Sequence, residues 1–513
     1  MAGCMARVFK WYDVALWGIA NSVASGLLIY SVQDIGRQGV YGADIAVSYV
    51  LGGVAFLPIV LAMIQVGMYV REVGGPYVLI SKTISPYMAF ISISFYMFAS
   101  GALLTIGFLT SLSVEFLSTP IYLAGHYTGN GFLTGLGLVL NSTTSMMVFS
   151  VIMVALIWMI NSGGYGAVRK SLYLTTLLPL TVLTALYVFT MVSPKTVSLL
   201  ENNLVDFHGI VKTVFSAEEA AQHGLLPLTP ADAESATLNY ALIVFWSYLG
   251  LEMPALLSGE VKEPEKSFVI GGFTAYHTVL LAYLLSSTVV KAAGSDLLVA
   301  YSYLYMNNPG LLQKFVSLEI LPQPSLFLPF YLTIHNSLLL VILGFAGFLF
   351  FFNTALTSWA SSLRAIHALS RDGFIPTYMG EFNRDTGVYP GANNIIFAGS
   401  LVGVALGLAS REFKIVRLVS LRIFNLSYGI MIMFLGLSLA IYGITSLAGT
   451  ARKYRRRKTA LPVVTGLSCF LTGLMITVNT GVGASFYDFV GIMLAGLLVT
   501  MLLLISISYT LRR

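Results

Sequence analysis

Residues 245–267 read FWSYLGLEMPALLSGEVKEPEKS, and this stretch decides how the rest of the chain is interpreted. It begins as an apolar run suited to a membrane helix, yet Gly250, Glu252 and Pro254 lie inside it. Glycine and proline weaken a helix, and an ionised carboxylate in hydrocarbon is costly unless it is paired or faces water. The stretch therefore predicts a membrane helix that is interrupted where its polar groups have a function.

The composition supports a membrane setting for this helix. Apolar residues make up 57% of the 513 residues and charged residues only 10%, and the mean hydropathy is +0.83. A soluble domain could not cover so much apolar surface, so we expect an all-α integral membrane protein that is surrounded by the lipid bilayer. The net charge of +6 is spread over short basic clusters between apolar runs, which does not indicate a nucleic-acid partner.

Twelve apolar runs approach the roughly 20 residues that a helix needs to cross the hydrocarbon layer. They are residues 14–32, 43–69, 87–117, 146–160, 171–192, 238–258, 268–292, 326–362, 392–410, 423–446, 461–480 and 488–509. Barrel strands would be shorter and would alternate strictly, so twelve transmembrane helices are predicted. With the N-terminus inside, 19 of the 28 Lys and Arg residues lie on the inner side, among them the cluster ARKYRRRK at 451–458. We therefore expect both termini in the cytoplasm and the protein in the plasma membrane, although the basic connection 411–422 opposes this orientation.

A second predicted helix carries polar and small residues in its middle. In VALWGIANSVASGLLIYSVQ (14–33), they are Asn21, Ser22, Ser25 and Gly26. The interrupted helices are the first and the sixth, so each is the first of five, as in transporters built from inverted repeats. Unwound backbone presents N–H groups to an anion and carbonyl groups to a cation. The two interrupted helices are therefore expected to bind a small zwitterion. Close packing of small residues between membrane helices remains the alternative.

Four stretches in order along the chain carry a resemblance to a known family. FWSYLGLEMPALLSGEVKEPEKS is similar to the sixth-helix signature of the amino acid–polyamine–organocation (APC) superfamily. VREVGGPYVLISK (70–82) and INSGGYGAVRKS (160–171) resemble loops of that superfamily, and residues 353–390 resemble its eighth helix and the segment that follows. The resemblance implies a permease that transports amino acids or related amines, rather than an enzyme with a cofactor.

The resemblance also implies a domain organisation, that of a LeuT-type 5+5 inverted repeat followed by two extra C-terminal helices. Residues 1–192 would then form the first repeat, and 193–237 an acidic extracellular loop. Residues 238–446 would form the second repeat, and 447–513 the last two helices and the cytoplasmic tail. No HExxH, GxSxG or GxxxxGK[ST] motif and no cysteine cluster points to an enzyme, a metal site or an ATP-driven pump.

Candidate site residues follow from the two interruptions and from the family motifs. Those expected to bind substrate are Asn21, Ser22, Ala24, Ser25, Gly26, Trp246, Ser247, Tyr248 and Gly250. The main-chain N–H groups of Ser25 and Gly26 would bind a carboxylate, and Ala24 stands where the family more often has glycine. The resemblance favours Trp246 as a gate, with a packing aromatic as the alternative.

Glu252 is the candidate for coupling or gating, because a carboxyl group at this depth is expected to be protonated for part of the time. A permanently protonated structural residue and an ion-paired residue remain alternatives. The charged tail after it, including Glu260 and Lys262, is expected to form a solvated turn that ends the helix.

The coupling ion is left open as H⁺ or Na⁺. A possible cation site comprises Thr354, Thr357, Ser358 and Ser361, whose hydroxyls lie on one face of the eighth helix and would act with first-helix carbonyls. Hydrogen bonds from these hydroxyls back to their own helix are the alternative. The sequence favours proton-coupled symport or exchange; the predicted site fits neutral or cationic amino acids, and neutral or broad specificity is expected. A sodium-coupled symporter, a polyamine transporter, and less readily a transporter-like receptor or channel, are the other interpretations.

Overall fold

The computed structural model describes residues 7–97, 105–200, 202–383, 385–447 and 460–481, and the backbone there is predominantly helical. Within these ranges the β structure is limited to three isolated bridges. Eight of the described helices are long and apolar enough to cross a membrane, or nine when one bent pair is counted as a single span. The predicted class, an all-α membrane protein, is therefore confirmed. The twelfth predicted span (488–509) and the cluster 451–458 lie outside the described residues.

The helices follow one another along the chain, with short 3-10 or π segments (η) between them. They are α1 (Trp11–Ser22), η1 (Gly26–Tyr30), α2 (Ser31–Gln33), η2 (Asp34–Gly36), α3 (Ile45–Tyr69), α4 (Gly75–Thr83), α5 (Pro86–Ser94), α6 (Gly107–Thr128), α7 (Gly131–Asn141), α8 (Thr143–Ser162), α9 (Gly164–Val192), η4 (Pro194–Val197), α10 (Phe207–Phe215), α11 (Ala217–Gln222), α12 (Ala233–Val244), η5 (Phe245–Tyr248), η6 (Met253–Leu257), α13 (Pro264–Ala293), α14 (Ser295–Asn307), α15 (Pro309–Leu312), η7 (Gln313–Phe315), α16 (Leu328–Thr333), α17 (Ser337–Arg371), η8 (Thr377–Gly380), α18 (Pro390–Glu412), α19 (Lys414–Leu447) and α20 (Leu461–Gly481).

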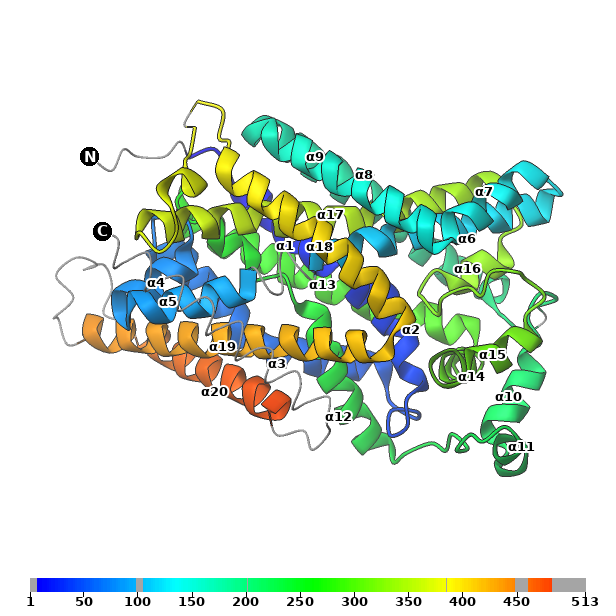
Figure 1. The fold of residues 1–513 in the computed structure, drawn as a ribbon. Helices are drawn as coiled ribbons and strands as arrows, with labels where there is room; N and C mark the ends of the chain where they lie inside the picture. Colours follow the sequence, from blue (N-terminus) through cyan, green and yellow to red (C-terminus); the bar gives the residue numbers. More distant parts are fainter. Residues whose placement is uncertain (1–6, 98–104, 201, 384, 448–459, 482–513) are drawn as a thin grey trace.

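Most of the long helices run along one direction and form an elongated bundle (Figure 1). Helix α1 packs against α13 and α17, and α17 is largely buried inside the bundle. Helices α6 to α9 flank one side, while α19 packs against α20 on another. One end of the bundle carries α4 and is called the α4 end below; the other carries α10, α14 and α15 and is called the α14 end.

Two predicted helix boundaries are wrong for the same physical reason. The third predicted span ended at 117 and the fourth began at 146, but α6 continues to Thr128 and α7 begins at Gly131. Gly129 ends α6 with φ of 66°, and the Asn130 side chain caps α7 by accepting hydrogen bonds from two backbone N–H groups. Ser118 and Thr119, which follow the predicted end of the apolar run, are buried inside the bundle, whereas His126 and Thr128 in the last turn of α6 are exposed. A polar face that points inward lowers local hydropathy without ending a helix.

The eighth predicted span is shifted in the same way. It was expected at 326–362, whereas α17 begins after Asn336, whose side chain accepts from the backbone N–H of Leu339, and continues to Arg371. Helix α16 precedes it as a separate short segment. The predicted loop 193–237 lies against the connection 293–325 at the α14 end, where Val205 and Val316 form an isolated antiparallel bridge.

Both predicted interruptions are present. Helix α1 ends at Ser22, and the chain resumes with a π-helical turn at Gly26, so that the two parts are bent by 46°. Helix α12 ends at Val244 and passes through a 3-10 turn into an extended residue, Leu249. A further 3-10 segment begins only at Met253. The predictions of a broken first and sixth span are confirmed.

Candidate functional site

The two interruptions are in direct contact inside the bundle. The Ser22 hydroxyl lies 3.4 Å from the carbonyl oxygen of Tyr248, and the Ser247 hydroxyl lies 3.4 Å from that of Gly26. At Gly250, φ is +108°, and a Cβ there would lie 2.5 Å from the Cβ of Asn21. Glycine is therefore required at position 250 both by the backbone conformation and by the close approach of the first interrupted helix at Asn21.

Helix α13 contributes a tyrosine that joins the two interruptions. The Tyr283 hydroxyl lies 2.8 Å from the carbonyl oxygen of Ser22 and 2.5 Å from that of Ser247, and its ring stacks on that of Tyr49. A Cβ at Gly26 would lie 2.6 Å from this hydroxyl. The buried Tyr283 thus satisfies carbonyl groups that the unwound helices leave free. Sequence reasoning missed this residue, since a tyrosine in an apolar span gives no signal of its partners.

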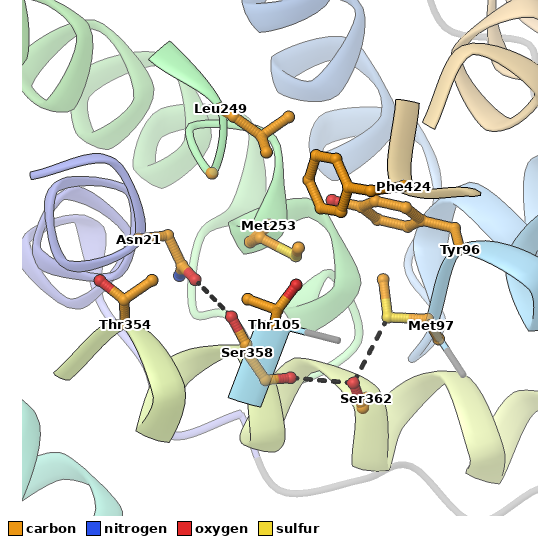
Figure 2. Close-up of a pocket in the computed structure, with 11 residues that line it drawn as sticks. Asn21, Tyr96, Met97, Thr105, Leu249, Met253, Thr354, Ser358, Ser362 and Phe424 are labelled. Carbon is orange, nitrogen blue, oxygen red and sulfur yellow. Dashed lines mark hydrogen bonds between the residues drawn. The ribbon is translucent and has the colours of Figure 1, made fainter. Parts of the chain in front are cut away.

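A small cavity of about 40 Å³ lies beside this contact (Figure 2). It is lined by Asn21, Tyr96, Met97, Thr105, Leu249, Gly250, Met253, Thr354, Ser358, Ser362 and Phe424. Two of the predicted substrate-binding residues, Asn21 and Gly250, are among them. Ser22, Ala24, Ser25, Gly26, Ser247 and Tyr248 do not line it and lie at or next to the contact between the two interruptions. Backbone packing fills the place that the sequence assigned to the ligand.

Trp246 lies outside the cavity wall but touches a residue of it. Its ring centroid is 6.4 Å from that of Phe424, which lines the cavity, and 5.8 Å from that of Tyr428. Both of these partners are on α19. Trp246 can therefore act on the cavity through Phe424, in a position that the sequence could not specify.

Three of the four hydroxyls predicted on one face of α17 point toward α1. Thr354 donates to the carbonyl oxygen of Ala20 at 2.7 Å, and Ser358 lies 3.2 Å from Asn21 Oδ1. Ser361 accepts from the indole N–H of Trp17 at 3.1 Å. These groups bring hydroxyl, amide and carbonyl oxygens of two helices together.

Thr357, the fourth of these residues, bonds back to its own helix. It donates to the carbonyl oxygen of Asn353 at 2.8 Å. The Asn353 side chain in turn contacts α9, where it accepts from Thr175 and donates to Thr176, both at 2.8 Å. The alternative of hydroxyls bonded within the helix thus applies to Thr357, and Thr354 also lies 3.2 Å from the carbonyl oxygen of Phe350 in its own helix.

Glu252 is buried and hydrogen-bonded on both oxygens. Its Oε1 accepts from the Tyr96 hydroxyl at 2.9 Å, and its Oε2 accepts from the backbone N–H of Gly250 at 2.8 Å. Among the described residues no Lys or Arg forms an ion pair with it. The bond to Gly250 ties the carboxyl group directly to the interruption. Close by, the Tyr428 hydroxyl is buried without a hydrogen-bond partner, and its ring centroid is 5.5 Å from that of Tyr96.

A second, very small cavity of about 10 Å³ lies on the other side of Tyr96. It is lined by Met63, Pro76, Ile93, Tyr96, Met97, Glu252, Met253, Leu256 and Met431. Tyr96, Met97 and Met253 are shared by both cavities and so form the partition between them. Pro76 belongs to α4, so the second cavity borders the helix that marks the α4 end.

The prediction of a solvated turn after Glu252 is wrong for Glu260, although Lys262 is exposed as expected. Glu260 is 0% exposed and forms an ion pair with the buried Arg364, with 2.9 Å between Nη2 and Oε2. Its other oxygen accepts from the hydroxyls of Tyr165 at 3.0 Å and Tyr389 at 2.6 Å. Local sequence suggested solvent because these partners lie far away along the chain.

The segment before α1 completes this cluster. The backbone N–H groups of Val8 and Phe9 donate to the carbonyl oxygen of Glu260 at 2.8 and 3.1 Å. The guanidinium carbon of Arg364 lies 5.9 Å from the ring centroid of Phe9 and 5.5 Å from that of Trp17, which are cation–π distances. We call Phe9, Trp17, Tyr165, Glu260, Arg364 and Tyr389 the Arg364 cluster. It ties the α4 ends of both interrupted helices to α17.

Comparison with known proteins gives a consistent result. The profile of a family described as amino acid permease matches residues 12–510. The glutamate/serine transporter AimA of Bacillus subtilis is 23% identical over 390 residues, which cover 74% of this chain and 61% of that protein. The vacuolar cationic amino acid transporter 8 of Arabidopsis thaliana is 22% identical over 302 residues, which cover 58% of this chain and 45% of that protein. The matched region thus spans about three fifths of the Bacillus subtilis protein and less than half of the Arabidopsis thaliana protein.

Proposed function

Because this chain belongs to the amino acid permease family, within the APC superfamily, we propose that it is a secondary active transporter of amino acids or related amines. The observation that carries the proposal is the pair of interrupted helices, which meet beside a cavity in the interior of the bundle. Discontinuous helices at a central site are characteristic of transporters that work by alternating access. The relatives that match, whose names describe amino acid transporters, support the same substrate class.

The proposed architecture is the LeuT-type arrangement of twelve helices, with repeats at 1–192 and 238–446 and two further helices at 447–513. In this arrangement α1 and α12 begin the two repeats, which accounts for an interruption in each. The distribution of basic residues supports an orientation with the α4 end and both termini in the cytoplasm and the loop 193–237 outside the plasma membrane.

Release of substrate toward the cytoplasm would pass the partition formed by Tyr96, Met97 and Met253. Glu252 holds this partition to the interruption, because one carboxylate accepts from both Tyr96 and Gly250. Protonation turns one of the two acceptor oxygens into a donor, so both bonds cannot be kept in the same form. A proton on Glu252 would therefore reverse or break the bond to Tyr96, and we propose that this change couples proton movement to opening of the partition.

Sodium coupling is the second candidate, and a specific set of oxygens supports it. The Ala20 carbonyl, the Thr354 hydroxyl, the Asn21 side chain and the Ser358 hydroxyl lie between α1 and α17. Hard cations such as Na⁺ prefer oxygen ligands of this kind, and a cation between these helices would lock the two interruptions in one arrangement. Exchange without a coupling ion would require neither protonation of Glu252 nor a cation bound to these oxygens.

Uptake into proteoliposomes tests the proposal. A labelled amino-acid mixture is supplied with an inward proton gradient, with an inward sodium gradient, or with unlabelled amino acids inside. Glu252→Gln is compared with Glu265→Gln, a control that changes an exposed carboxylate outside the cavities. Accumulation under the proton gradient that only Glu252→Gln abolishes would support proton coupling. Absence of uptake under all three conditions would refute the transporter proposal, and non-saturable flux would indicate a channel.

A further inference from the structure

The cavity beside the two interruptions has a polar side and an apolar side. Figure 2 shows Asn21 and Thr354 on one side, and Leu249, Met253 and Phe424 on the other. The polar side comes from α1 and α17, and it continues through Ser358 and Ser362. The apolar side comes from the second interruption and from α19, with Met97 completing it.

None of the eleven lining residues carries a charge. The nearest carboxyl group that the structure describes, Glu252, lines the second cavity, and both of its oxygens are already hydrogen-bonded. The stretch between Met97 and Thr105 reads FASGALL and contributes no charged residue to this part of the chain. The cavity therefore offers a hydrogen-bonding surface and an apolar surface, but no ionic partner for a charged side chain.

This arrangement has a direct consequence for selectivity. Every amino acid carries the same amino and carboxylate groups, which can form hydrogen bonds with the hydroxyl and amide groups of the polar side. A charged substrate side chain would be buried against Leu249, Met253 and Phe424 without a counter-ion, which is strongly unfavourable. A small polar side chain would leave the apolar side uncovered.

Building on the proposed function, we propose that the cavity selects neutral amino acids with an aliphatic or thioether side chain, such as leucine and methionine. Met97, Leu249, Met253 and Phe424 are then the residues that determine specificity. Methionine side chains are flexible and polarisable, so this wall adapts to side chains of differing shape. In an apolar pocket, each methylene of the substrate changes kcat/KM by roughly tenfold or more. Leucine is therefore expected to exceed alanine, serine, glutamate and lysine by at least about tenfold.

The test measures transport and binding separately. Uptake of labelled leucine, methionine, alanine, serine, glutamate, lysine and putrescine is compared in proteoliposomes with proton and sodium gradients both applied. Binding of the same compounds to the detergent-solubilised full chain is measured by isothermal titration calorimetry. Preferred uptake and binding of leucine and methionine would support the inference.

The possible failures are distinguishable. Equal or better uptake of serine, glutamate, lysine or putrescine would overturn the selectivity and leave the transporter proposal standing. Selective binding of leucine without any uptake would support the inference about the cavity while refuting transport. Absence of leucine binding would overturn the inference directly.

A pair of matched variants tests the apolar wall itself. Phe424→Ala removes a ring that lines the cavity, whereas Phe434→Ala removes a part-buried ring of the same helix that lines neither cavity. We expect the ratio of kcat/KM for leucine to that for alanine to fall about tenfold in Phe424→Ala and to stay unchanged in Phe434→Ala. Equal changes in both variants would show that α19 acts through its packing, which would overturn the specificity role of Phe424.

Discussion

The buried ion pair of the Arg364 cluster makes a quantitative prediction about stability. Glu260→Gln keeps the size of the side chain and its ability to accept hydrogen bonds from Tyr165 and Tyr389, but it removes the negative charge. The guanidinium of Arg364 would then remain buried, with the Ala360 carbonyl as its other recorded acceptor, at 2.6 Å. Breaking a buried ion pair by removing one partner costs roughly 3–5 kcal/mol, so Glu260→Gln is expected to reduce the free energy of unfolding by this amount.

A double-mutant cycle separates the ion pair from other effects of the substitutions. Arg364→Met alone leaves Glu260 charged and buried, so a similar loss of roughly 3–5 kcal/mol is expected. The double variant Glu260→Gln/Arg364→Met contains no uncompensated charge. Its loss of stability should therefore not exceed the loss in either single variant. If the two substitutions acted independently, their losses would add instead.

Unfolding in mixed detergent micelles, followed by tryptophan fluorescence, provides the free energies. Glu265→Gln is the control, because its ion pair with Arg71 is exposed on both sides, and exposed pairs contribute only about 0–1 kcal/mol. A loss below about 1 kcal/mol in Glu260→Gln would refute the reasoning. Strict additivity in the double variant would refute it as well, because it would show that the two charges do not act on each other.

Three other predictions concern the interruptions and the oxygens between α1 and α17. Gly250→Ala should reduce stability by about 1–3 kcal/mol and abolish uptake, because the added Cβ has no room and φ is positive at this position. Gly166→Ala is the control and should retain uptake, because its Cβ would meet open space. Thr354→Val should remove any sodium dependence of uptake, while Thr357→Val, which loses only a bond within α17, should keep it; the same sodium response in both would contradict the sodium site. Tyr283→Phe should lower stability by about 1–3 kcal/mol and slow uptake, since it leaves buried carbonyls of both interruptions without this donor; unchanged unfolding and uptake would contradict its bridging role.

The helix ends show the limit of local hydropathy. The apolar runs predicted the membrane class correctly, because the transfer of a segment into lipid depends mainly on that segment's own composition. They placed the ends of α6 and α17 wrongly, because the polar faces of these helices are buried against other helices. Burial of a face is a property of packing, and single-segment hydropathy does not contain it.

For the candidate site too, some features follow from local sequence and others only from the packing of distant segments. Glycine, proline and small polar residues within apolar runs determined where the first and sixth spans would break, since these residues set backbone conformation locally. Only the tertiary structure decided that the breaks touch each other, that Tyr283 bridges them, and that the cavity lies next to this contact. It likewise decided that Glu260 is buried opposite Arg364, 104 residues away along the chain. Local conformation is encoded in neighbouring residues, whereas the partner of a charge and the wall of a cavity arise only when distant segments pack together.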